Sequence, residues 1–183
     1  MLNAVDRMLC DAGEDVAQTE HAMKIRSAKD DDLVGIKSLL ATCELPTEDV
    51  TTGLLPGFLV AVDEGAAIVG SVCLEPLGAD ALLRSLSVAL HLRATGLGKS
   101  LRLAIEREAR ASNYGSLWLL TTSTPQFFEN HGYSAVKRTD VPDEVRETAQ
   151  FMRLCPSTAV CMRKHFACAI TLRAIERDER LAR

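Results

Sequence analysis

Arginine, lysine and glycine gather in one short segment, Arg93–Ser100, which reads Arg-Ala-Thr-Gly-Leu-Gly-Lys-Ser. A β-like run precedes this segment and a helical pattern follows it. Glycines at such a turn let a ligand approach the backbone closely, and the first-turn N–H groups of the helix, which have no partner within the helix, attract an anion. Arg93 and Lys99 add positive charge at the same place. The segment therefore predicts a phosphate-binding loop.

Spacing separates three kinds of phosphate loop. A Walker A loop needs a glycine five residues before Gly98, where the chain has Arg93, and no Mg²⁺-binding strand is evident. A dinucleotide fingerprint that starts at Gly96 needs a third glycine at position 101, which is Leu101. The pattern Arg/Gln-x-x-Gly-x-Gly/Ala is met in full by Arg93–Gly98. This third pattern is favoured, and a P-loop nucleotide-binding protein is the least favoured alternative.

In this pattern the chain resembles the GCN5-related N-acetyltransferase (GNAT) superfamily, in which the loop holds the pyrophosphate of acetyl-coenzyme A. The resemblance covers roughly residues 24–165 and extends to two further segments. Ser85–Val88 resembles the family's fourth strand, whose backbone pairs with the pantetheine arm. Pro125–Tyr133 resembles the family's segment whose helix packs along the cofactor. The resemblance implies acetyl-CoA as co-substrate and no metal.

A narrower resemblance is to the small acetyltransferases found with arsenic-resistance genes, which are similar to amino-acid N-acetyltransferases of the N-acetylglutamate synthase type. Leu82–Leu86, Leu119–Thr122 and Leu154–Val160 carry it. It implies an acceptor such as an amino acid or an analogue of the phosphinothricin or arsenical type.

The superfamily pattern implies a set of cofactor-binding residues, namely Leu86, Ser87, Val88, Arg93, Ala94, Thr95, Gly96, Leu97, Gly98, Lys99, Ser100, Phe127 and Phe128. Three positions depart from the family. Leu90 replaces the usual proline two residues after the strand valine. Ala94 replaces the common glycine and lacks its backbone freedom. Phe128 replaces a tyrosine that, in many relatives, protonates the departing thiolate, so the coenzyme must leave with help from water or another donor.

Acetyl transfer to an amine requires a base. Glu75, near the end of a predicted strand, is the first candidate, and Glu129 and His131 follow. Each also fits an ordinary surface or hairpin-end residue.

Arg84 lies in an otherwise apolar strand and therefore needs an anionic partner. Its planar fork suits a carboxylate or phosphinate, so we expect it to anchor the acid group of the acceptor, or else to pair with Asp80, Glu75 or another acid. Thr121 and Thr122 are expected to hydrogen-bond a ligand or to cap the next helix.

Periodicity predicts the elements that position these residues. A helix follows Asp30–Asp32 with Leu33, Ile36, Leu39 and Leu40 on its apolar side, and a second helix spans 97–112 with Leu97, Leu101, Ile105 and Ala109 inward and Arg102, Glu106, Arg107 and Arg110 outward. Shorter helices are expected at Pro125–Asn130 and Asp143–Phe151. Strands are expected at Met23–Arg26, Phe58–Val62, Ala67–Leu74, Ala81–Val88, Ser116–Leu120, Tyr133–Lys137 and Ala159–Arg163.

This order is typical of an α/β (α+β) protein. With the resemblance, it predicts the GNAT fold: a mixed central sheet of about six to seven strands, flanked by helices and splayed between the fourth and fifth strands.

Composition sets the remaining expectations. The chain has 183 residues, 47% hydrophobic and 25% charged, as expected of one globular domain. We expect that domain at 23–166, preceded by an N-terminal arm or early start (1–22) and followed by a helical tail (167–183) that could form a homodimer. The net charge of -4 argues against nucleic acid. No signal-like or membrane-length apolar run is present, so a cytoplasmic location is expected. The six cysteines contain no Cys-x-x-Cys pair, which favours reduced, packed thiols.

These observations favour an enzyme that transfers the acetyl group of acetyl-CoA to the amino group of a small amino acid or analogue carrying an acid group. Two alternatives stay open: an acetyl-CoA-binding sensor that has lost catalysis, and an acetyltransferase of protein or polyamine amines.

Overall fold

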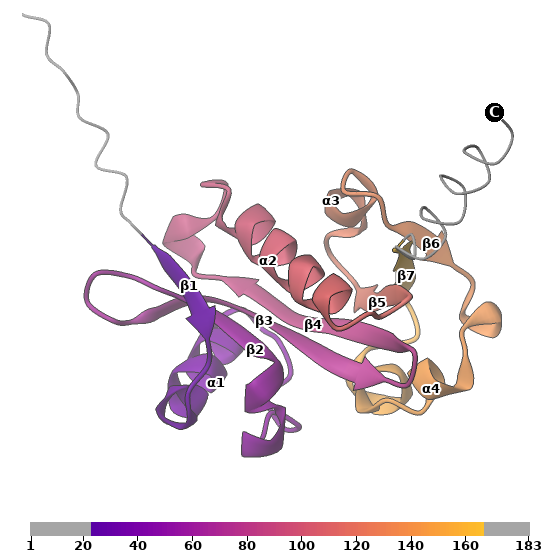
Figure 1. Cartoon of the computed structure of the whole chain (residues 1–183), viewed down its shortest axis with the longest axis horizontal. Helices are drawn as coiled ribbons and strands as arrows, with labels where there is room; N and C mark the ends of the chain where they lie inside the picture. Colours follow the sequence, from indigo (N-terminus) through magenta and orange to yellow (C-terminus); the bar gives the residue numbers. More distant parts are fainter. Residues whose placement is uncertain (1–22, 167–183) are drawn as a thin grey trace, which may run out of the picture.

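The computed structural model describes residues 23–166, so the expected arm (1–22) and tail (167–183) lie outside the described residues. These residues form a mixed seven-stranded sheet in the order β1-β2-β3-β4-β5-β7-β6 (Figure 1). The strands are β1 (Lys24–Ser27), β2 (Phe58–Val62), β3 (Ile68–Leu77), β4 (Asp80–Val88), β5 (Ser116–Thr121), β6 (Ser134–Val136) and β7 (Val160–His165). The α-helices are α1 (Leu33–Thr42), α2 (Leu97–Ala111), α3 (Pro125–Glu129) and α4 (Asp143–Arg146). None of the helices in this range is long and apolar enough to cross a bilayer.

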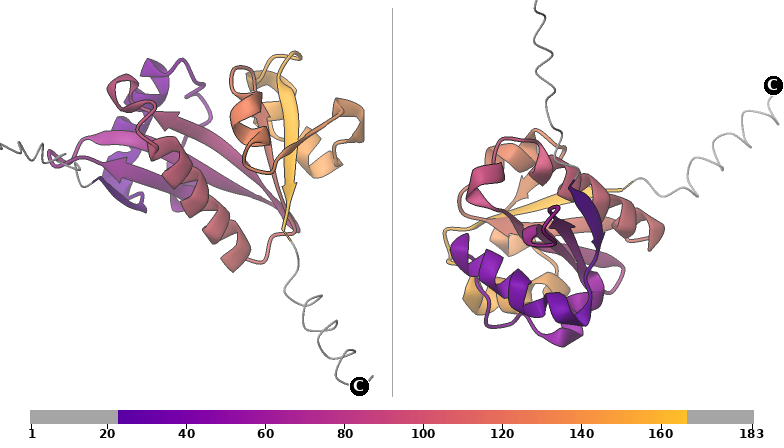
Figure 2. Two further views of the ribbon diagram at one scale, coloured as in Figure 1. Left: turned by 90° about the horizontal axis from the view of Figure 1, so that it is seen from above. Right: turned by 90° about the vertical axis from the view of Figure 1, so that its left-hand side faces the viewer.

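The two long helices cover opposite faces of the sheet (Figures 1 and 2). Side chains alternate between faces along a strand, so neighbours on β3 enter different cores. Val72 packs in the cluster that contains the apolar side of α2, including Leu101 and Ile105. Cys73 packs in the cluster that contains Ile36 and Leu40 of α1. The predicted inward faces of both helices are confirmed.

The sheet opens between its fourth and fifth strands, as predicted. Strands β4 and β5 run parallel and pair only at Ala81–Leu117 and Leu82–Trp118. Beyond Leu82 the two strands diverge, and the left view of Figure 2 shows the halves of the sheet separating from a shared end. The edge of β4 that faces β5 therefore has no strand partner from Leu83 onward, and its backbone polar groups are available to a ligand.

One expectation about α2 is wrong. Arg102 and Glu106, expected to face outward, are only 3% and 2% exposed. Arg102 donates a 2.6 Å hydrogen bond to Glu106, Lys164 of β7 donates one of 2.8 Å, and the hydroxyl of Tyr133 donates one of 3.1 Å. The polar side of α2 is buried because it contacts the second half of the sheet, which supplies these partners.

The single helix expected at Asp143–Phe151 is also wrong. The segment forms the one-turn helix α4 and then a π-helical turn at Gln150–Leu154. Arg138 stabilises this turn. Its guanidinium lies over the ring of Phe151, 4.0 Å from the centroid. It also donates hydrogen bonds to the carbonyl oxygens of Phe151 and Ala159. π-Helical turns are often found at functional sites, and this one borders the cleft described next.

Candidate active site

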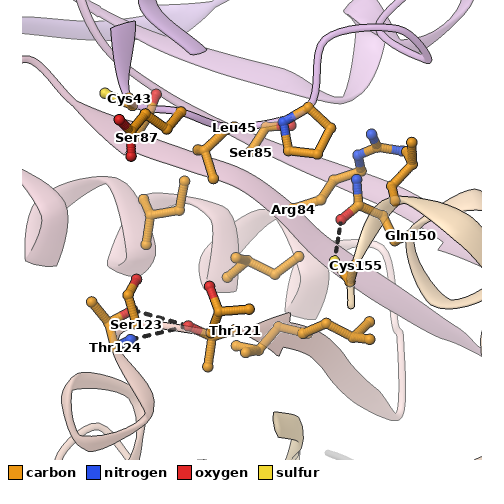
Figure 3. A pocket seen from close by; sticks show the side chains of 18 of the residues that line it. Cys43, Leu45, Arg84, Ser85, Ser87, Thr121, Ser123, Thr124, Gln150 and Cys155 are labelled. Carbon is orange, nitrogen blue, oxygen red and sulfur yellow. Dashed lines mark hydrogen bonds between the residues drawn. The ribbon is translucent and has the colours of Figure 1, made fainter. Parts of the chain in front are cut away.

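A cleft of about 470 Å³ occupies the opening of the sheet (Figure 3). One wall is the unpaired part of β4, Leu83–Val88, and the opposite wall is Leu119–Thr124 with Phe128. The segment Cys43–Pro46 after α1 and the residues Gln150 and Leu154–Pro156 line it as well. The sheet itself thus forms both long walls, so the residues beside β4 and β5 can contact one ligand.

A β-bulge shapes the β4 wall. Ser71 pairs with Ser87, and Cys73 pairs with Arg84, so two residues of β4 stand opposite Val72. Ser85 adopts a left-handed conformation with a φ of 55°. The hydroxyl of the buried Ser71 holds this conformation by donating to the carbonyl oxygen of Ser85 at 3.0 Å. Bulges redirect backbone groups next to a site. Sequence reasoning missed Ser71, whose only signal was a lone hydroxyl in an apolar strand.

The predicted phosphate loop joins the cleft to α2. Gly96 is the N-cap of α2 with a φ of 92°, a conformation that suits glycine. No side chain caps this helix, so its first N–H groups are available to an anion. Arg93 lines the cleft, while Lys99 is exposed on the first turn. The side chain of Leu97 is buried in the core, which leaves its backbone for a ligand.

Ala94 takes a φ of 64° in the same loop, where the family commonly has glycine. Left-handed backbone costs an L-residue roughly 1–2 kcal/mol. The loop therefore adopts the left-handed backbone conformation that glycine favours, and alanine at position 94 makes this conformation strained.

At the other end of the cleft, Arg84 forms the ion pair that the sequence offered as one alternative. Its side chain is 2% exposed, and its two terminal nitrogens donate to Asp49 at 2.5 Å and to Glu75 at 2.8 Å. Asp80 does not pair with Arg84; its carboxylate accepts a hydrogen bond from the indole N–H of Trp118 instead. Burial lowers the pKa of Arg84, but the hydrogen bonds to Glu75 and Asp49 outweigh it, so that pKa is raised. Both ends of the fork already bind a carboxylate.

The three candidate bases lie outside the lining of the cleft. Glu75 is half-buried behind Arg84. Glu129 is exposed on α3. His131 shares a 2.6 Å hydrogen bond with the carbonyl oxygen of Phe127 at the end of that helix. Of the three, Glu75 is bonded to a residue of the cleft wall.

Hydroxyl groups cluster where β5 ends. Thr121 is buried, and its oxygen accepts a 3.2 Å hydrogen bond from the backbone N–H of Thr124, immediately before α3. The helix α3 has no side-chain capping hydrogen bond, so the expected cap is not formed; Thr121 bonds the N-cap residue Thr124 itself, in the turn before the helix. Thr122 and Ser123 line the cleft. Phe128 also lines it and packs edge-to-face with Phe127 and with Tyr133.

Sequence reasoning did not assign Cys43, Gln150 or Cys155 to the cleft. The thiol of Cys155 donates to the amide oxygen of Gln150 at 3.3 Å, and burial raises the pKa of this thiol (Figure 3). The thiol of Cys43 donates to the carbonyl oxygen of Val88 at 3.5 Å. Cys43 is more than a hundred residues from Gln150 and Cys155 in the sequence, so their position in one cleft follows from the fold and not from a local motif. Within residues 23–166, His, Cys, Asp and Glu form no group suited to a metal ion.

Several solved structures have a fold similar to that of this chain. N-acetylglutamate synthase from Neisseria gonorrhoeae, complexed with coenzyme A and N-acetyl-glutamate, superposes with a TM-score of 0.70 at 20% identity, over 79% of this chain and 35% of that one. Rv2747 from Mycobacterium tuberculosis, in complex with CoA and NLQ, gives 0.68 at 22% identity, over 79% of this chain and 99% of that one. A GNAT-family acetyltransferase from Staphylococcus aureus Mu50 gives 0.65 at 16% identity, over 80% of this chain and all 100% of that one.

The chain therefore has the fold of the GCN5-related N-acetyltransferases. It spans about a third of the length of the N-acetylglutamate synthase. No protein-family model and no curated protein sequence matches the chain.

Proposed function

We propose that this chain is an acetyl-CoA-dependent N-acetyltransferase that acts on the α-amino group of a small amino acid or amino-acid analogue. The observation that carries the proposal is the cleft between β4 and β5, bordered by a bulged, unpaired strand and reached by the uncapped N-terminus of α2. The similar structures support it, because two of them contain coenzyme A together with a small ligand.

The chain's own groups fit acetyl-CoA, which would supply the acetyl group as a thioester. The first N–H groups of α2, with Arg93 and Lys99, suit the pyrophosphate. The free backbone edge of β4 from Leu86 to Val88 suits the amide groups of the pantetheine arm. A backbone N–H of this edge is the proposed donor to the thioester oxygen, and such a donor is worth about 3 kcal/mol when charge develops there.

Acetyl transfer then requires the amine nitrogen to bond the acetyl carbon while the carbon–sulfur bond breaks. The electron pair leaves with the coenzyme thiolate, and the amine loses a proton. We propose Glu75 as the proton acceptor, through a water, because it is the candidate base attached to the cleft wall. Phe128 has no proton to give, so water or another donor protonates the thiolate.

The test is mass-spectrometric detection of acetylated product from acetyl-CoA and a panel of amino acids, phosphinothricin-type and arsenical analogues, polyamines and peptides. Acetylated amino acids or analogues are the expected products. Product from polyamines or peptides alone would replace the proposed acceptor class.

A second candidate is a sensor that binds acetyl-CoA without turnover, and the observation that favours it is Phe128 in the cleft wall. Calorimetric binding of acetyl-CoA with no product from any acceptor would support the sensor.

A further inference from the structure

We infer that the acceptor end of the cleft selects amino acids with an uncharged side chain over acidic ones. This inference rests on the proposed function, and it concerns the substrate class of the same site. It follows from the charges beside Arg84, for which the sequence left open both acid binding and an internal ion pair.

Both terminal nitrogens of Arg84 are paired with carboxylates, and its Nε is buried without a hydrogen-bond partner in the described part of the chain. Arg84 is buried and carries one positive charge, whereas Asp49 and Glu75 bring two negative charges to its terminal nitrogens. The cluster therefore has an excess of one negative charge. One oxygen of Asp49, Oδ1, is buried without a hydrogen-bond partner, so this excess is not neutralised by another donor in the described part of the chain.

The rest of this end adds no positive charge to the cleft lining. Gln150 and Leu154–Pro156, which line this end, carry no charged side chain. Glu44 is exposed at the opening and follows Cys43, whose thiol donates to the carbonyl oxygen of Val88 at the phosphate-loop end. Arg93 lines the cleft beside the phosphate loop and donates to the carbonyl oxygen of Val88 at 3.4 Å. Arg138 lies outside the lining, against the ring of Phe151.

The Arg84 end of the cleft does offer a neutral hydrogen-bonding group, the side-chain amide of Gln150. The amide oxygen of Gln150 accepts from the thiol of Cys155, which orients the amide (Figure 3). Its nitrogen donates to no group in residues 23–166 and so remains for a ligand. An uncharged polar side chain can use this amide without entering a field of like charge, whereas a second carboxylate is repelled.

The experiment compares matched acceptors on the full chain: L-glutamine with L-glutamate, and L-asparagine with L-aspartate, each by kcat/KM from acetylated product. We expect the amides to be preferred by about tenfold or more, because the buried charge excess repels a side-chain carboxylate. Equal or better use of the acids would overturn the inference while leaving the proposed function intact. Acetylation of no amino acid would overturn both.

A variant tests the cause. Asp49→Asn removes the excess charge and is expected to reduce the preference about threefold or more. Glu48→Gln, on the same segment and outside the lining, and Glu44→Gln, exposed on the Val88 side of the opening, are the controls and should leave the ratio unchanged. An unaltered ratio in Asp49→Asn would overturn the inference.

Discussion

The hydroxyl of Ser71 on β3 donates a 3.0 Å hydrogen bond to the carbonyl oxygen of Ser85, the residue at which β4 bulges toward the cleft. The same hydroxyl lies 2.9 Å from that of Ser87. A buried side chain of one strand thereby fixes the backbone that the next strand presents to a ligand.

Ser71→Ala removes this support without adding bulk. A lost hydrogen bond of this kind costs about 1 kcal/mol, so we expect turnover to fall about fivefold while the Kd for coenzyme A changes little. Single-turnover acetyl transfer and calorimetry measure the two quantities. Ser134→Ala, on the exposed strand β6, serves as the control. If turnover is unchanged in Ser71→Ala, the bulge does not depend on this bond.

Ala94→Gly should relieve the strained backbone of the phosphate loop. Removing a left-handed alanine gains roughly 1–2 kcal/mol, and the greater freedom of glycine in the unfolded chain takes back about 0.5–1 kcal/mol. The expected net change is a rise of about 0.5 kcal/mol in the free energy of unfolding, measured by urea denaturation. Ala41→Gly, in helix α1, should lower it instead. A loss of stability in Ala94→Gly would show that the loop is unstrained.

Glu75→Gln keeps the shape of the side chain and removes its proton affinity. If Glu75 accepts the amine proton, the acetylation rate falls about 100-fold or more, since general bases contribute 10²–10⁴-fold. Affinity for acetyl-CoA should persist, because the phosphate loop lies at the other end of the cleft.

The same measurement on Glu129→Gln decides between the two carboxylates, and Glu64→Gln, in the β2–β3 turn, is the neutral control. A rate within twofold of the original in Glu75→Gln would remove Glu75 from the mechanism.

Glu106 should give the fold a measurable dependence on pH. Burial raises the pKa of this carboxyl, but hydrogen bonds from Lys164 and Arg102 outweigh it, so its pKa lies below the ordinary 4.5. The stabilisation is therefore complete above pH 4.5 and is lost as pH falls through the lower, folded-state pKa. Glu106→Gln should cost about 3 kcal/mol at pH 7, because two cations lose their partner.

The difference in the free energy of unfolding between the original protein and Glu106→Gln, measured by urea denaturation, should then become smaller below pH 4.5. Glu108→Gln, exposed on the same helix, should show neither effect. A gap that stays constant with pH would mean that the charge of Glu106 contributes nothing.

Local pattern and the family resemblance were sufficient for the fold, but insufficient for the contacts between distant segments. The helix at 97–112 follows from apolar spacing alone, but the burial of Glu106 depends on Lys164, which lies on β7 across the sheet. Likewise, the apolar strand around Arg84 predicts that this residue needs an anionic partner. That the partner is Asp49 depends on how the segment after α1 passes β4, which the sequence does not show. Arg138 donates a hydrogen bond to the π-helical turn at Gln150–Leu154. No periodicity in the sequence indicates this contact.

The two residue pairs that join β4 to β5 also bear on how the molecule comes apart. Backbone hydrogen bonds join strands β1–β4 into one body and strands β5–β7 into another. The buried polar side of α2 contacts the second body through Lys164. Such bodies behave as separate cooperative units in native-state hydrogen exchange. A ligand seated along the open edge of β4 would act as the missing strand between them, so its binding should appear as slowed exchange on both sides of the opening at once.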